Sequence, residues 1–133
     1  MIKLKIVTPQ KIFLTDNFEM VTVPAQKGEL AILPDHVPIL ANLKAGLIAA
    51  YSANIISKKI IINSGILNFA NNEATILAEE IIDNKKYNKK YLTNQINMLE
   101  EKLHGYLQTG NDIALNQTQA KITDLLTIQS LLS

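Results

Sequence analysis

Up to about residue 83, polar and apolar residues alternate in short runs. Ile2, Leu4 and Ile6 alternate with two lysines, which is the two-residue period of a half-buried strand. Turn-forming pairs interrupt the pattern at 8–9, 16–17, 27–28, 45–46, 64–65 and 71–72. Further apolar runs of strand length lie at 18–23, 47–51, 59–63, 66–69 and 74–78. Many short strands at this spacing predict a β-sandwich or flattened barrel with one core.

After Asp83 the period changes to three or four residues, which predicts helices. The apolar face of a first helix of about six turns is formed by Tyr91, Leu92, Ile96, Leu99, Leu103, Tyr106 and Leu107. Asp83 or Asn84 is expected to cap it, and Gly110 to end it. Asn111 or Asp112 would cap a second helix. Its apolar face is formed by Leu115, Ile122, Leu125, Leu126, Leu131 and Leu132.

Two amphipathic helices with a short connection predict an antiparallel hairpin. The expected fold class is therefore α+β, with an N-terminal β-sandwich followed by a C-terminal two-helix hairpin. We expect the β-sandwich domain to span residues 1–83 and the helical hairpin domain to span residues 84–133.

Composition and charge exclude several classes of function. The chain is 47% hydrophobic and 19% charged, as in globular proteins, and its net charge of +1 gives no field that would attract nucleic acid. The absence of cysteine excludes disulfides, thiolate catalysis and cysteine-bound metal. No apolar run approaches the roughly 20 residues that span a bilayer. Membrane association is therefore expected only through a protein partner, and the lack of an organellar presequence favours the bacterial cytoplasm.

The segment 25–40 sets a glycine turn, an apolar run and two prolines around a single histidine. Gly28 can adopt the positive φ of a tight turn, Pro34 should end the strand, and Pro38 favours an extended backbone before it. His36 should therefore lie at a bend. One interpretation is a bend residue whose imidazole is hydrogen-bonded to nearby backbone, and the other is a functional histidine.

Catalysis by this chain alone is not expected. Glu29, Asp35 and His36 are close in sequence, but an acid–base site also needs a nucleophile or a bound substrate, and no serine elbow is present. His36 and His104 lack metal-ligand spacing, and there is no glycine-rich phosphate loop. We therefore predict a chain that is not an enzyme and that has no metal or cofactor.

The central block of the chain resembles a known signature. Residues 28–46 read GELAILPDHVPILANLKAG, which resembles the signature of the epsilon subunit of F-type ATP synthase. Residues 62–80, INSGILNFANNEATILAEE, are similar to a later sandwich signature of that family, whose members pair a β-sandwich with a helical hairpin. The family often has glycine where Ala31 and Asp35 stand, so Asp35 adds a charge beside His36.

The resemblance implies a non-catalytic rotor subunit of the central stalk. It would bind the gamma subunit and the c ring, and would couple proton passage to rotation and ATP synthesis. Glu29 and His36 match positions that face the c ring in the family, and they are the expected partner contacts. The hairpin could open toward the catalytic alpha/beta head and hinder ATP hydrolysis. The complex would place the chain peripherally at the cytoplasmic face of the bacterial inner membrane.

Four lysines lie within residues 85–90, where they would oppose the dipole of a helix that begins there. They can form a solvated basic face or contact an anion or acidic partner. In some family members a motif Ile-Asp-x-x-Arg-Ala binds ATP at this place. The chain keeps Ile82 and Asp83 but has Lys86 and Tyr87 in place of the arginine and alanine, and lysine cannot reproduce a planar bidentate fork. Asp83 and Lys86 are the nucleotide-binding candidates, with ATP as a regulatory ligand a hypothesis.

Two alternatives of other classes stay open. One is a free small-molecule-binding β-sandwich with a helical lid and His36 in its pocket. The other is a small acid–base hydrolase that would lose turnover in a His36→Ala variant. Co-purification with a gamma subunit would distinguish both from the stalk subunit.

Overall fold

The computed structural model describes residues 1–83 and 85–132. Internal packing divides the chain into two compact units, Met1–Ile82 and Asp83–Ser133. The first unit is built of strands and the second of two helices, so the predicted α+β fold class is confirmed.

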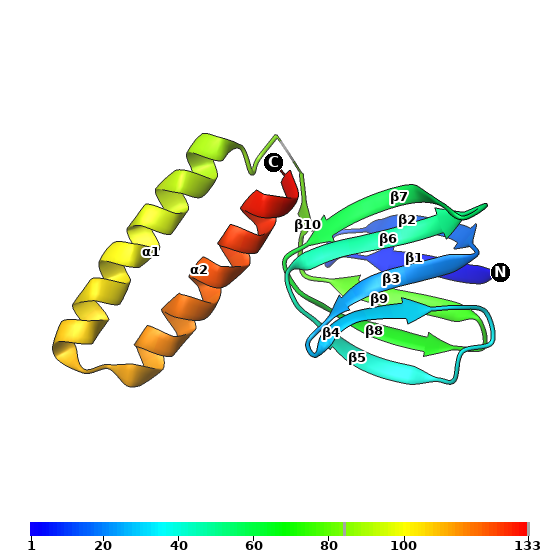
Figure 1. Cartoon of the computed structure of the whole chain (residues 1–133), viewed down its shortest axis with the longest axis horizontal. Helices are drawn as coiled ribbons and strands as arrows, with labels where there is room; N and C mark the ends of the chain where they lie inside the picture. Colours follow the sequence, from blue (N-terminus) through cyan, green and yellow to red (C-terminus); the bar gives the residue numbers. More distant parts are fainter. Residues whose placement is uncertain (84, 133) are drawn as a thin grey trace. The chain divides into compact units, whose positions relative to one another are not determined.

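The first unit is a β-sandwich (Figure 1). Its strands are β1 (Ile2–Val7), β2 (Ile12–Phe18), β3 (Met20–Ala25), β4 (Gly28–Ile32), β5 (Ile39–Leu43), β6 (Gly46–Ser52), β7 (Ile55–Ile62), β8 (Gly65–Ala70), β9 (Glu73–Ala78) and β10 (Ile81–Ile82). Hydrogen bonds join them in the order β10-β7-β6-β3-β5-β8-β9-β1-β2, and β4 pairs with β3. Two layers can be followed in Figure 1: β7, β6, β3 and β4 form one, and β5, β8, β9, β1 and β2 form the other.

One of the places where the chain crosses from one layer to the other lies between β5 and β6. β5 pairs with β3 only through Leu43 and Ala25, whereas β6 continues along β3 from Tyr51 to Ala49. At the crossing the backbone of Gly46 lies against Pro24, and a Cβ added to Gly46 would lie 2.5 Å from the Pro24 Cβ. A glycine is therefore needed for this close approach.

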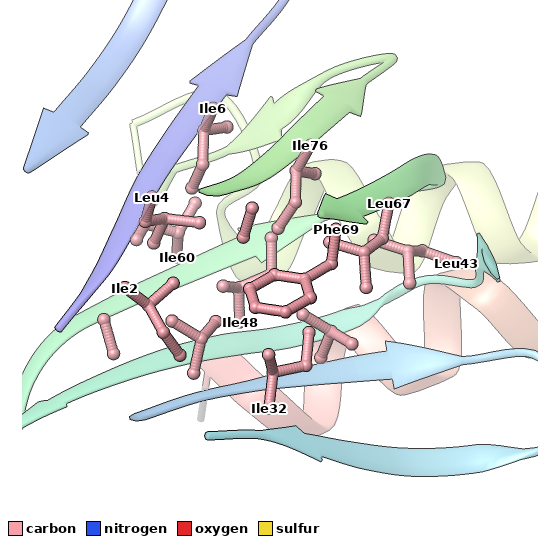
Figure 2. Packing of buried hydrophobic residues seen from close by; sticks show 14 of the residues in the cluster. Ile2, Leu4, Ile6, Ile32, Leu43, Ile48, Ile60, Leu67, Phe69 and Ile76 are labelled. Atoms are coloured by element: carbon pink, nitrogen blue, oxygen red, sulfur yellow. The ribbon is translucent and has the colours of Figure 1, made fainter. Parts of the chain in front are cut away.

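The core lies between the two layers, and Figure 2 shows Phe69 among the side chains that fill it. Ile2, Leu4 and Ile6 are fully buried, whereas Lys3 is exposed, so the predicted alternation of β1 is confirmed. The other fully buried large side chains are Phe18, Ile32, Leu43, Ile48, Ile62, Leu67 and Ile76.

The turn predicted at 16–17 is wrong. Asp16 and Asn17 lie inside β2 and pair with Leu4 and Lys3 of β1. Pairing with β1 along its length overrides the turn preference of these two residues, and the chain reverses at Glu19 instead. β5 was not among the predicted runs, although four of its five residues are apolar.

The second unit is a pair of helices, α1 (Lys89–Thr109) and α2 (Asp112–Leu132), packed against each other as a hairpin. The predicted cap of α1 is wrong. Asn88 caps the helix, because its side-chain oxygen accepts a hydrogen bond from the Tyr91 N–H at 2.8 Å. Asp83 instead closes a turn before the helix, and Asn84 lies outside the described residues.

The connection between the helices agrees with the prediction. Gly110 has a φ of 71° and its N–H donates to the Tyr106 carbonyl, which ends α1. The Asn111 side chain accepts from the Ala114 N–H at 3.2 Å and caps α2. Within the described residues, neither helix has the length and apolar character needed to cross a membrane.

The predicted apolar faces are correct only in part. Leu92 and Ile96 are buried as predicted, but Leu107 is 60% exposed and Leu126 is 49% exposed. The buried Ile128 of α2 was not part of the predicted face. The apolar stripe of each helix is therefore wider than the part of it that is buried.

Candidate functional site

The predicted bend at His36 is a tight turn between β4 and β5. The His36 N–H donates to the Leu33 carbonyl at 3.1 Å, which closes a four-residue turn. Pro34 occupies its second position and Asp35, with a φ of 67°, its third. Proline followed by a residue with positive φ is the pattern of a type II turn.

The His36 ring is held inside this loop. Its Nδ1 atom lies 2.7 Å from the Val37 carbonyl oxygen, to which it donates a hydrogen bond. The ring also meets the buried Phe69 edge-on, with ring centroids 6.0 Å apart. The interpretation of His36 as a bend residue bonded to nearby backbone is therefore confirmed. Since Nδ1 carries the proton, Nε2 of the neutral ring is the acceptor that the loop can offer to a partner.

Asp35 is bonded to a distant turn. Its N–H donates to the Asn72 Oδ1 at 2.6 Å, and the Asn72 Nδ2 donates to the Asp35 Oδ1 at 3.0 Å. Asn72 follows β8, so these bonds join the β4–β5 loop to the β8–β9 turn. No local sequence signal marks this pair, because the residues are 37 positions apart.

Glu29 lies at the other end of β4 from His36. It follows Gly28, whose φ is 130°, and pairs with Pro24 beside the β3–β4 turn, with its side chain exposed. The strand between them spans about 13 Å. The structure therefore does not bring Glu29 together with Asp35 and His36, and the acid–base triad considered from the sequence is not formed.

An exposed apolar row crosses the outer face of the second layer, and sequence reasoning missed it. Ile66 of β8 pairs with Leu77 of β9, Leu77 with Val7 of β1, and Val7 with Ile12 of β2. Ile66, Leu77 and Ile12 are 44%, 54% and 58% exposed. Leu40 of β5 lies on the same face and is 74% exposed. We refer to Ile66, Leu77, Val7 and Ile12 as the apolar row.

A groove of about 640 Å³ continues the apolar row at the end of the sheet that carries the β1–β2 and β7–β8 turns. Its lining includes Pro9, Leu43, Ile66, Leu77 and Ala78. Exposed apolar side chains beside a concave surface are typical of a protein contact.

Asp83 and Lys86 lie together in a turn that precedes α1. Asp83 Oδ1 accepts from the backbone N–H groups of Lys85 and Lys86, both at 3.0 Å. The Lys86 ammonium lies 5.4 Å from the centre of the Tyr87 ring. A groove of about 600 Å³ lies nearby in the hairpin, but its described lining includes neither Asp83 nor Lys86. Their role in nucleotide binding stays a prediction.

No three side chains among His, Asp and Glu come together as metal ligands in the part of the chain that the structure describes. The chemistry available at the site is therefore that of surfaces: an apolar row, an oriented imidazole and an exposed carboxylate.

Comparison with known proteins decides the family. Residues 1–84 match the family model described as ATP synthase, Delta/Epsilon chain, beta-sandwich domain. The chain belongs to this family. The ATP synthase epsilon chain of Rickettsia typhi is 30% identical over 75% of this chain and 93% of its own length. The epsilon chain of Pelagibacter ubique is 34% identical over 74% of this chain and 76% of its own length.

Solved structures support the fold of the epsilon family. A chain in the structure of Euglena gracilis mitochondrial ATP synthase, OSCP/F1/c-ring, matches with a TM-score of 0.79 at 15% identity, over 99% of this chain and 81% of that one. A chain in the Tetrahymena thermophila central stalk and c-ring structure matches with a TM-score of 0.55 at 21% identity, over 66% and 70%. The epsilon chain is a subunit of a complex rather than a catalytic subunit, so the prediction of a chain that is not itself an enzyme is confirmed.

Proposed function

We propose that this epsilon-family chain is a rotor subunit of the ATP synthase central stalk, which binds the gamma subunit and the c ring and couples rotation to ATP synthesis. The observation that carries the proposal is the apolar row on the outer face of a sandwich of this family. Membership of the epsilon family and the central-stalk and c-ring assemblies named for its structural neighbours support it.

The apolar row is the proposed contact for gamma. Its four side chains come from four adjacent strands, so they form a rigid surface that needs no ordering on binding. Leu40 widens the surface, while Lys3, Lys5 and Glu73 give its neighbouring rows the polar character of an interface rim. His36 lies in the loop that leads into β5, a strand of the same layer, and it is proposed to contact gamma as well.

Glu29 is the proposed contact for the c ring. It stands exposed beside the β3–β4 turn, in a groove of about 540 Å³ whose lining also includes Lys27 and Leu40. A carboxylate and an ammonium on a loop held by Gly28 suit polar contact with the loops of another subunit. Glu29 and His36 lie at opposite ends of β4. A partner that docks at one end of this strand therefore contacts only one of the two residues.

The hairpin is the proposed regulatory element. Each helix has 21 residues, which gives it a length of about 31 Å. An opened hairpin could therefore reach the catalytic alpha/beta head and hinder ATP hydrolysis. The exposed Leu107, Ile113 and Leu126 would supply apolar contacts in that state. The complex would hold the chain peripherally at the cytoplasmic face of the bacterial inner membrane.

The test is affinity for the gamma subunit, measured with the full chain and two variants. Leu77→Glu places a charge in the apolar row, and burying an unpaired charge costs about 3 kcal/mol, or more than a hundredfold in affinity. Ser57→Glu adds the same charge on β7 in the other layer and is the matched control. We expect Leu77→Glu to abolish the complex and Ser57→Glu to leave it intact. A wild-type chain that forms no stable complex with gamma would refute the proposed function.

A further inference from the structure

The pair formed by Asp35 and Asn72, called the latch from here on, joins two turns that each contain a residue with a positive φ. Asp35 has a φ of 67° and Asn72 a φ of 60°, both in the left-handed region that favours glycine. Such conformations persist in other residues when the surrounding structure holds them. The two hydrogen bonds of the latch, at 2.6 and 3.0 Å, supply that hold.

The latch is anchored to the core through β1. The Asn72 carbonyl accepts a hydrogen bond from the Lys3 N–H at 2.9 Å. Lys3 stands between Ile2 and Leu4, which are both fully buried. Three segments that are far apart in sequence therefore meet at Asn72: the first strand, the β4–β5 loop and the β8–β9 turn.

The loop that the latch holds presents the side chains of a contact surface. Leu33 is 55% exposed and Val37 is 69% exposed, and they flank the half-buried His36. Asp35 directly precedes His36, and the turn bond runs from the His36 N–H to Leu33. The position of Asp35 therefore sets the direction in which His36 and its Nε2 atom point.

We propose that the latch pre-organises the β4–β5 loop for docking to the gamma subunit, with Asp35 and Asn72 as positioning residues that need not touch the partner. This inference rests on the proposed function. A loop already in its binding conformation pays less ordering entropy on association. If the latch breaks, only a fraction of the molecules has the loop in its binding conformation at any time. The association rate, and with it the apparent affinity for gamma, is then reduced in proportion to that fraction.

The experiment compares association with gamma across variants that keep the backbone unstrained. Asn72→Gly removes both hydrogen bonds of the latch. Asp35→Gly removes only the bond from the Asn72 Nδ2 to the Asp35 Oδ1, because the backbone N–H of residue 35 remains. Both variants place glycine at a positive φ. The D35N/N72D double variant exchanges the carboxylate and the amide, so that a side-chain N–H can again donate across the pair. Asn71→Gly is the matched control, because Asn71 also has a positive φ of 52° and its side chain is outside the latch.

We expect Asp35→Gly to slow association about fivefold, the factor that corresponds to one net hydrogen bond. Asn72→Gly, which loses both bonds, should slow it at least as much, and the dissociation rate should change less than twofold in either variant. The double variant should recover the wild-type rate, and Asn71→Gly should match it throughout. Amide hydrogen exchange of residues 33–38 in the free chain should quicken in the single variants only. The melting temperature of the single variants should fall only by the few degrees that the loss of these hydrogen bonds produces, and it should return in the double variant.

Unchanged association in both single variants would overturn the latch while leaving the proposed function standing. A different outcome is that the association rates fall in parallel with the melting temperatures of the variants, without recovery in the double variant. Asp35 and Asn72 would then have only a structural role, and the inference would also be overturned. If the wild-type chain itself does not bind gamma, the proposed function fails, and the latch fails with it.

Discussion

The crossing at Gly46 offers a sharp test of the fold, because the substitution is a single methyl group. In Gly46→Ala the new Cβ would lie 2.5 Å from the Pro24 Cβ and 3.0 Å from its Cγ. Carbon atoms in contact normally lie about 3.5–4.0 Å apart, so the chain must shift by roughly 1 Å at this point. The proline ring is rigid and Pro24 lies within β3, so the shift falls on the strands. Overpacking of this kind costs about 1–3 kcal/mol.

A loss of about 2 kcal/mol lowers the melting temperature of a domain this size by roughly 8–16 °C. The assay is calorimetric melting of Gly46→Ala beside Gly105→Ala, which makes the same chemical change in α1. A Cβ at Gly105 meets nothing within 4 Å, so alanine there should stabilise the hairpin by about 0.5–1 kcal/mol. Opposite signs for the two variants support the packing argument. Equal melting of Gly46→Ala and the wild type would refute it.

Two further predictions concern the hairpin. Asn88→Ala removes the cap of α1, whose oxygen accepts from the Tyr91 N–H at 2.8 Å, and should destabilise the hairpin by about 1 kcal/mol; Asn94→Ala, exposed inside the helix, should show no such loss in helix melting followed by circular dichroism. A chain that ends at Asp83 should bind the stalk-depleted catalytic complex without inhibiting ATP hydrolysis, whereas the full chain should lower turnover. Equal turnover with both bound chains would contradict a regulatory hairpin.

Local sequence patterns predicted most of the elements, and failed where non-local pairing decides the structure. The alternation in β1 and the helical periods after Asp83 are properties of short segments, so they can be recognised directly. The turn at Asp16 and Asn17 was predicted wrongly because the pairing with β1 cannot be seen in those residues alone. The start of α1 was placed too early because Asp83 and Asn88 are both good caps, and only the Tyr91 N–H distinguishes them.

The candidate site was predicted in pieces. The bend at His36 follows from the two prolines around it, but its Phe69 neighbour comes from β8. The partner of Asp35 is Asn72, 37 residues away. The apolar row needs the register of four strands, and Val7 and Leu77 meet only through the parallel pairing of β1 with β9. Surfaces assembled from distant strands in this way leave no contiguous motif in the sequence.

The parallel pairing of β1 and β9 also bears on how the chain comes to be folded during synthesis. β1 leaves the ribosome well before its neighbour β9, which spans Glu73–Ala78, so the two meet only after most of the sandwich has been made. Until then Ile2, Leu4 and Ile6 have only β2 beside them, and the apolar side chains of the nascent chain are open to other proteins. Long-range pairing of this kind slows folding, whereas the hairpin that follows needs only local contacts. Formation of the sandwich should therefore be the slow step of folding, during which the chain is prone to aggregate. The sandwich should also be the part of the nascent chain on which a chaperone acts.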